Sequence, residues 1–350
     1  MKAGPAIGRR RVLAVLAAAG GLPLWPGRIG ATPSWTWQGD ALGTSARIQL
    51  CHPDQAQARS LVEACVAELR RLEAAFSLYR ADSELSLLNR DGFLEFPSPD
   101  FRALMSMARD WGALTDGAFD ATVQPLWRLY ADHFAAHPGD RSGPAAPALA
   151  EACRQVDYRA VDISPRRIAF GKPGMAATLN GIAQGYITDR VVDRLREGGI
   201  DSTLVEMGEI AGIGLRGDSA PWTVAVPDAG GRIALSLPLR DRAIATSAGY
   251  ATPFDRDRRF HHLFVPRSGA CANHVDTLSV VAGTATAADA LSTALYVTPP
   301  LDVPAMLRRV RAAAGPVEAV ALRGGDLVRL TATTAFVPSV PPSSTKGDLS

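Results

Sequence analysis

The sequence predicts a mixed α/β fold in which helices pack around one sheet system. Strand-like runs begin near residue 35 and become frequent after about residue 160, and segments with helical spacing of apolar residues lie between them. At 350 residues, the chain is long enough for one large domain or two small ones without disulfide support. An alternation of this kind is typical of helices that cover a sheet.

The N-terminal segment is predicted to be a signal peptide over residues 1–31. Three arginines at positions 9 to 11 precede an apolar run over 12–24, and small residues follow. This order is typical of a signal peptide, and the adjacent arginines favour the twin-arginine route. The apolar run is about 13 residues long, whereas a helix that spans a bilayer needs roughly 20. We therefore expect export to the periplasm rather than a permanent membrane anchor.

The first half of the mature chain predicts one strand and two helices. Residues 35–50 alternate as a strand does, and residues 55–76 carry apolar side chains at helical spacing, so a strand followed by a helix is the simplest interpretation. Residues 97–115 predict a second helix, which a turn at 115–117 ends. Residues 136–148 are rich in Pro, Gly and Ala, and they predict a surface loop or a boundary between two lobes.

The clearest helix in the second half is predicted to start near Asn180. Apolar residues at Ala183, Ile187, Val191 and Leu195 repeat every four positions, and a Gly-Gly pair follows. Strands are expected at 163–170, 202–207, 222–227, 232–239, 243–247 and 277–283. The last segment, 338–350, has the composition of a disordered tail. The folded domain is therefore expected over 35–337.

Charge and cysteine content argue against several functions. Lys and Arg number 37 against 35 Asp and Glu, and without the basic first dozen residues no basic excess remains, so nucleic acid is not an expected partner. The four cysteines form no C-x-x-C pair, which leaves a zinc site unsupported. An oxidising compartment would allow one or two disulfides among them, and buried free thiols are the alternative. The cysteines are Cys51, Cys65, Cys153 and Cys271.

A carboxylate and a hydroxyl on one helix face form the first candidate site. Thr284 can cap a helix whose Leu291 and Leu295 face inward. Asp289 and Thr293 are four residues apart, so a helix places both on the same face. Their oxygens suit Mg²⁺. The same spacing also occurs on ordinary solvated helix faces.

Two further segments carry candidate groups. In LNGIAQGY at 179–186, glycines lie at a helix start, where free backbone amides attract phosphate. The alternative is that Asn180 caps the helix and the glycines allow close packing. In RRFHHLFVPRSG at 258–269, His261 and His262 are adjacent. Adjacent residues of a strand point to opposite faces, so at most one of the two histidines should face a given site.

Eight short segments in order along most of the mature chain carry a family resemblance. They are LGT at 42–44, FSLYRADSELSLLNRDG at 76–92, TDGAFDATVQPLWRLY at 115–130, LNGIAQGY at 179–186, VEMGEIAGIG at 205–214, IATSAGY at 244–250, FHHLFVPRSG at 260–269 and TATAADALSTAL at 284–295. Together and in this order, they resemble the ApbE-type FAD:protein FMN transferases, formerly named thiamine-biosynthesis lipoproteins.

The resemblance implies a two-lobed domain that binds FAD between its lobes and cleaves the pyrophosphate. FMN would pass to a Ser or Thr hydroxyl of an acceptor with an FMN-binding domain, a membrane or periplasmic redox protein, and AMP would be released. The implied cofactor is Mg²⁺, with Asp289, Thr293 and the backbone carbonyl of Gly181 as its ligands. His262 is the implied catalytic group, which helps to activate the acceptor hydroxyl.

The implied FAD contacts come from several of these segments, and some of them differ from the family's usual residues. They are Leu42, Tyr79, Ala118, Phe119, Asp120, Thr178, Gln184 and His262. Leu42 stands where a methionine is usual, Thr178 where an acidic residue is common, and Gln184 where a lysine is common. Val265 replaces an aspartate, and Met207 replaces a glycine. Because one acidic and one basic group are lost together, we expect FAD binding to persist through hydrogen bonds.

Two alternative functions use the same residues. If water replaced the acceptor hydroxyl, the protein would be a Mg²⁺-dependent FAD pyrophosphatase that releases FMN and AMP. The substitutions at Thr178, Gln184 and Val265 are also compatible with a non-catalytic periplasmic flavin-binding protein. The products formed from FAD in the presence of an acceptor distinguish these possibilities.

Overall fold

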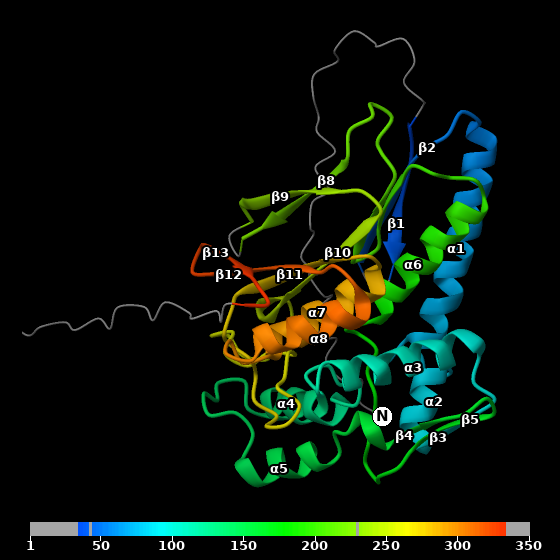
Figure 1. The fold of residues 1–350 in the computed structure, drawn as a ribbon. Helices are drawn as coiled ribbons and strands as arrows, with labels where there is room; N and C mark the ends of the chain where they lie inside the picture. Colours follow the sequence, from blue (N-terminus) through cyan, green and yellow to red (C-terminus); the bar gives the residue numbers. More distant parts are fainter. Residues whose placement is uncertain (1–33, 42–43, 229–230, 334–350) are drawn as a thin grey trace, which may run out of the picture.

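One eight-stranded antiparallel sheet forms the centre of the molecule (Figure 1). The computed structural model describes residues 34–41, 44–228 and 231–333. The sheet has the strand order β1-β2-β6-β7-β10-β11-β12-β13, and all neighbouring strands are antiparallel. The strands are β1 (Ser34–Ala41), β2 (Thr44–Cys51), β6 (Thr203–Glu206), β7 (Ile210–Ile213), β10 (Arg242–Ala248), β11 (Thr277–Ala282), β12 (Glu318–Arg323) and β13 (Asp326–Leu330).

Two smaller sheets and eight α-helices complete the described part of the chain. The smaller sheets are β8-β9, from β8 (Trp222–Pro227) and β9 (Ile233–Leu239), and β3-β5-β4, from β3 (Phe93–Glu95), β4 (Val161–Ile163) and β5 (Arg167–Phe170). The helices are α1 (Gln55–Phe76), α2 (Glu84–Asp91), α3 (Pro99–Leu114), α4 (Gln124–Ala136), α5 (Ala146–Arg154), α6 (Ala183–Glu197), α7 (Ala285–Val297) and α8 (Val303–Ala314). Short 3₁₀ turns lie at Tyr158–Ala160 and Gly249–Ala251.

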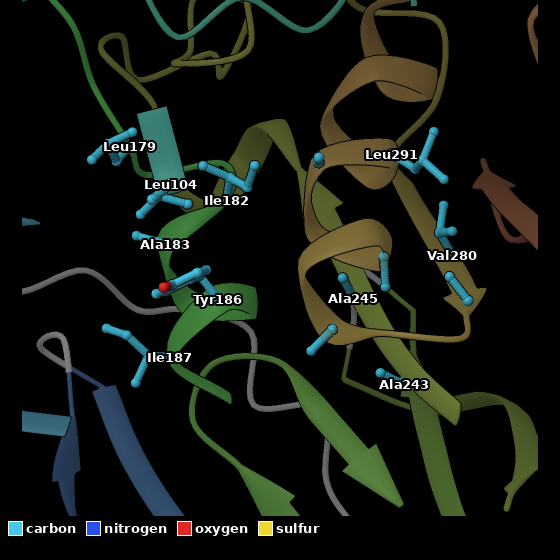
Figure 2. Packing of buried hydrophobic residues seen from close by; sticks show 14 of the residues in the cluster. Leu104, Leu179, Ile182, Ala183, Tyr186, Ile187, Ala243, Ala245, Val280 and Leu291 are labelled. Carbon is cyan, nitrogen blue, oxygen red and sulfur yellow. The ribbon is translucent and has the colours of Figure 1, made fainter. Parts of the chain in front are cut away.

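The two faces of the central sheet have different coverings because side chains alternate along each strand. On β10, Ala243 and Ala245 belong to the main core with α1, α6, α7 and α8, whereas Ile244 packs with Trp222 and the β8-β9 hairpin. In Figure 1 this hairpin lies on the side of the sheet opposite α7 and α8. The main core brings α6 and α7 together over β10 and β11. Figure 2 labels Leu104, Leu179, Ile182, Ala183, Tyr186, Ile187, Ala243, Ala245, Val280 and Leu291 in this core.

A separate apolar cluster anchors the histidine-bearing segment 258–269 to α4. Its buried members are Leu126, Tyr130, Phe134, Ala152 and Phe264. The Tyr130 hydroxyl donates a hydrogen bond to the Gly269 carbonyl at 3.1 Å. The Tyr130 ring also lies 5.1 Å from that of Phe264, centroid to centroid. The Tyr130 ring lies 6.0 Å from that of Phe260 as well, so the residues on both sides of His262 pack against α4.

The structure confirms the main elements expected from apolar spacing. The helices predicted at 55–76 and 97–115 are α1 and α3, and the predicted turn after α3 has positive φ angles at Asp116 and Gly117. The stripe Ala183, Ile187, Val191 and Leu195 of α6 is buried. Strands occur at each of the six positions expected after residue 160. The mixed α/β fold class is thus confirmed.

Two local expectations were wrong. Residues 35–50 were expected to form one strand, but they form the antiparallel hairpin β1-β2, whose two strands share the same alternating pattern. Asn180 does not cap α6, because residues 180–182 form a turn and the helix begins at Ala183 after Ile182. The Asn180 amide instead donates to the Thr178 hydroxyl at 3.3 Å.

Other expectations are settled in part or lie outside the described residues. The four cysteines are free thiols. Residues 137–145 form the expected loop, but α5 begins at Ala146 within the range predicted as loop. The predicted signal peptide, the C-terminal tail 338–350 and Leu42 are not among the described residues. None of the described helices has the length and apolar character that crossing a membrane requires.

Candidate functional site

The candidate site forms where α6 and α7 approach each other closely. A Cβ atom on Gly185 would overlap the Ala285 carbonyl oxygen, so this helix contact requires glycine. Across the contact, the Gly185 amide donates a hydrogen bond to Asp289 Oδ2 at 3.0 Å. Thr284 caps α7 by accepting from the Ala287 amide at 3.1 Å, as the sequence predicted. The cap sets where α7 starts and therefore which of its residues face α6.

A cavity of about 140 Å³ lies beside this helix contact. It brings together eight of the residues proposed from the sequence, which come from four separate parts of the chain. They are Phe119, Asp120, Thr178, Gly181, Gln184, His262, Asp289 and Thr293. Asp289 and Thr293 lie on the same wall, as their spacing on a helix predicts.

Two of the proposed FAD contacts lie outside this cavity. Tyr79 lines a neighbouring cavity of about 320 Å³, and its side chain is 79% exposed. Trp127 and Asn180 line both cavities, so the two are adjacent. Ala118 lines a third cavity, which also contains Val265.

Asp289 shares its end of the central cavity with a second buried carboxylate, Glu209. Both residues line the cavity, at 4% and 7% exposure. Burial raises the pKa of Asp289 to about 7, although the hydrogen bond from the Gly185 amide acts in the opposite direction. Burial, and then the charge of Asp289, raise the pKa of Glu209 well above its ordinary value. The site therefore favours either a proton or a cation between these groups.

Thr293 and its neighbours provide hydroxyl oxygens next to Asp289. The Thr293 hydroxyl lies 3.5 Å from that of Ser247, which in turn lies 2.8 Å from the Ser292 hydroxyl. A Cβ on Gly181 would be 3.0 Å from Thr293 Oγ1, so the backbone of 181 approaches this hydroxyl closely. Carboxylate, hydroxyl and backbone oxygens at one point are the donor set that Mg²⁺ prefers. The residues present therefore fit the cofactor expected from the sequence.

The two adjacent histidines have different environments, as their positions in sequence predicted. His261 is fully buried, and its Nε2 lies 3.2 Å from Asn273 Oδ1. Burial lowers the pKa of His261, which favours the neutral ring. His262 lines the central cavity on the wall formed with Leu263 and Phe264. Only His262 is placed to meet a molecule in the cavity.

Asp120 holds the loop that forms another wall of the cavity. Its Oδ1 accepts hydrogen bonds from the amide and the hydroxyl of Thr122, at 2.8 and 2.6 Å. Its Oδ2 accepts from the Tyr158 amide at 3.0 Å. Burial raises the pKa of Asp120, and these three hydrogen bonds oppose that shift. The hydrogen bonds of this carboxylate therefore stabilise the loop that carries Phe119.

Gln184 lies against the turn that carries Glu209. A Cβ on Gly208 would overlap the Gln184 amide nitrogen, and Gly208 has a φ of +92°. Glycine at 208 thus satisfies both the backbone conformation and the close approach of Gln184. Gln184 thus contributes a neutral amide to the cavity wall at this point.

The sequence interpretation missed Glu209, Ser247 and Trp127 as cavity residues. Glu209 had a detectable signal, because it is a carboxylate directly before the run IAGIG, which has no polar side chain. Ser247 and Trp127 gave no such signal in the sequence, since a serine in a strand and a tryptophan in a helix are common and do not indicate a site. Only the packing of β10 and α4 around the cavity identifies them.

A comparison with family models gives the class of protein to which this fold and cavity belong. The model of the ApbE family matches residues 42–316. This range covers most of the chain, and the protein therefore belongs to the ApbE family.

Individual relatives agree with this assignment. The chain is 30% identical over 318 residues to a FAD:protein FMN transferase of Treponema pallidum (strain Nichols), covering 80% of this chain and 86% of the relative. It is 29% identical to the FAD:protein FMN transferase of Haemophilus influenzae, covering 74% and 79%. Enzymes of this name thus match the protein across most of its length.

Solved structures show the same fold. The ApbE protein of Thermotoga maritima superposes with a TM-score of 0.74 at 28% identity, covering 85% of this chain and 97% of that one. The apo form of the Pseudomonas stutzeri flavinyl transferase ApbE gives a TM-score of 0.72 at 25% identity, covering 87% and 98%. The mixed α/β architecture described above is the one found in these proteins.

Proposed function

We propose that this protein transfers the FMN part of FAD to a Ser or Thr hydroxyl of an acceptor flavoprotein, with Mg²⁺ as cofactor and AMP as the second product. The observation that carries the proposal is the convergence of Asp289, Thr293 and Gly181 on one wall of a cavity whose other wall carries His262. The first three would hold Mg²⁺, and FAD would bind along the central cavity and the adjacent one that Tyr79 lines.

The proposed reaction is a displacement at phosphorus. The acceptor hydroxyl oxygen bonds to the FMN phosphorus, the bond from that phosphorus to the bridging oxygen breaks, and AMP leaves with the bridging oxygen. His262 accepts the proton of the hydroxyl, which is a poor nucleophile at neutral pH. When bound, Mg²⁺ neutralises charge on the pyrophosphate oxygens. Asp289 and Thr293 would hold this cation at the cavity wall.

The proposed reaction takes place in the periplasm. The support is the arginine-rich start and the short apolar run at 12–24, which are typical of a twin-arginine signal. A membrane or periplasmic redox protein with an FMN-binding domain is the expected acceptor. Such an acceptor would meet the enzyme only after export.

Incubation of the purified protein with FAD, Mg²⁺ and an FMN-binding acceptor domain tests the proposal. Covalent flavin on the acceptor, together with AMP, is the expected result. Free FMN and AMP in equal amounts, with no flavin on the acceptor, would show a pyrophosphatase instead. Unchanged FAD would show a binding protein without this activity.

His262→Ala tests the proposed base. Loss of a general base is expected to lower the transfer rate by roughly 10²- to 10⁴-fold, with FAD affinity changed far less. The matched control is His137→Ala, because His137 is exposed at the end of α4 and lines no described cavity. Transfer by His262→Ala at the unmodified rate would refute the base assignment and leave the metal assignment intact.

A further inference from the structure

Glu209 lies on the turn between β6 and β7, at the bottom of the central cavity. The turn is closed by a hydrogen bond from the Met207 amide to the Glu209 carbonyl at 2.9 Å. The Glu209 side chain is only 7% exposed, and it lines the cavity opposite α7. It is not among the residues to which the family resemblance gives a role.

One oxygen of this carboxylate is buried without a partner. Within the described part of the chain, no group forms a hydrogen bond with Glu209 Oε2. The backbone of Thr246 provides the hydrogen bond that Glu209 does accept. A buried polar atom left unpaired costs about 1 to 3 kcal/mol, and more when it is charged. Native structures rarely retain such an atom without a water molecule, a ligand or an ion to satisfy it.

The surroundings of Glu209 contain negative charge and no fixed positive charge. Asp289 lines the same cavity and makes one side-chain hydrogen bond among the described residues, to the Gly185 amide. No Lys or Arg lines this cavity in the described residues. Two carboxylates that are buried together repel each other unless a cation or a proton lies between them.

We propose that Glu209 is a second acidic group of the cation site, and that Glu209 and Asp289 together bind a divalent cation before the nucleotide arrives. Hydroxyl oxygens of Thr293 and Ser247 lie on the same side of the cavity and extend the set of oxygen donors. A hard divalent cation such as Mg²⁺ or Mn²⁺ matches this all-oxygen set. The inference rests on the proposed function for the identity of the site, but it concerns cation binding, a step that precedes the binding of FAD.

Mn²⁺ binding to the full-length mature protein without FAD tests the proposal. Electron paramagnetic resonance measures free Mn²⁺, and isothermal titration calorimetry measures the affinity directly. We expect the unmodified protein to bind one Mn²⁺, and Glu209→Gln to bind it at least about 10-fold more weakly, since loss of a ligand or its partner typically costs 10- to 100-fold. Glu209→Gln keeps the size of the side chain, and thermal unfolding without metal checks that it folds.

Glu206→Gln is the matched control. Glu206 is a carboxylate three positions away at the end of β6, but it pairs in register with Arg47 and does not line the cavity. Its removal is expected to leave Mn²⁺ affinity unchanged. Equal affinity of Glu209→Gln and the unmodified protein would overturn the proposal, and would indicate that a proton neutralises Glu209.

Failure of this inference and failure of the proposed function give different results. If the unmodified protein binds Mn²⁺ only when FAD is present, the early cation site is refuted while flavin transfer remains possible. If Mn²⁺ binds without FAD and Glu209→Gln weakens it, yet no acceptor receives flavin, the cation site stands and the transferase proposal fails.

Discussion

Two aspartates join α6 to α7 in opposite directions, Asp289 buried and Asp189 half-buried, and of the two only Asp289 lines the central cavity. Asp189 on α6 accepts hydrogen bonds from the Ala285 and Thr286 amides and from the Thr286 hydroxyl, at 2.7, 2.8 and 2.5 Å. Asp289 on α7 accepts one from the Gly185 amide on α6, at 3.0 Å. Each aspartate therefore accepts hydrogen bonds from backbone amides in the first turn of the helix that carries the other aspartate.

The two aspartates differ in how many of their carboxylate oxygens the contact between α6 and α7 uses. Both oxygens of Asp189 accept hydrogen bonds from α7, so this group is used for the helix contact. Asp289 uses Oδ2 for the helix contact and also lines the cavity beside Glu209. The comparison teaches that a buried carboxylate indicates a ligand site only where its hydrogen bonds within the protein are incomplete.

The largest expected difference concerns flavin transfer. Asp289→Asn should lower the transfer rate by about 10³-fold, because metal stabilisation of developing charge is worth several kcal/mol and 1.36 kcal/mol corresponds to tenfold. Asp189→Asn is the matched substitution on the partner helix, and it should retain most of the activity. The measurement is the rate of covalent flavin attachment at saturating FAD and Mg²⁺. Similar losses in both variants would mean that helix packing, rather than the cavity carboxylate, limits the reaction.

A smaller difference is expected for two threonines of α7. Thr293→Val removes a hydroxyl that lines the cavity, so the Mg²⁺ needed for half-maximal transfer should rise about 10- to 100-fold. Thr286→Val removes only the hydroxyl that donates to Asp189, so this requirement should not change. A titration of the transfer rate with Mg²⁺ compares the two. An unchanged titration for Thr293→Val would remove Thr293 from the proposed ligands.

The smallest expected difference is in stability without metal. Asp189→Asn should lower the free energy of unfolding by about 2 kcal/mol, because hydrogen bonds to a charged group are weakened at the start of α7. Asp289→Asn should leave it equal or higher, since one of two neighbouring buried charges is removed. Urea unfolding in the presence of a chelator measures both values. Destabilisation of Asp289→Asn by as much as Asp189→Asn would show that the two carboxylates have the same structural role.

Several features of the fold were predictable because they are set by local patterns. The stripe of α6, the cap of α7 at Thr284 and the placement of Asp289 and Thr293 on one face all follow from helix geometry. The family was also predictable, because its short motifs occur in order along the chain. The β1-β2 hairpin was missed because both of its strands continue the same alternation.

The helix start at α6 shows the limit of local rules. Asn180 is a favourable capping residue by type, yet Thr178 accepts a hydrogen bond from its amide and a turn separates it from the helix. The proposed contacts Tyr79 and Ala118 likewise lie in cavities beside the central one, which no sequence spacing could show. Which residues share a cavity depends on contacts between segments that are far apart in the chain.

By itself, the sequence determined α1, α3, α6, the cap of α7, the strands expected after residue 160, the family and the helix face that carries Asp289 and Thr293, because apolar periodicity and capping act over a few residues. Only the tertiary structure decided which acidic residues keep a carboxylate oxygen that accepts no hydrogen bond from the protein. Where α6 approaches α7 at Gly185, both carboxylate oxygens of Asp189 accept hydrogen bonds from α7. The turn at Gly208 places Glu209 in the same cavity as Asp289. Hydrogen bonds between distant segments, and the removal of water around them, make that distinction.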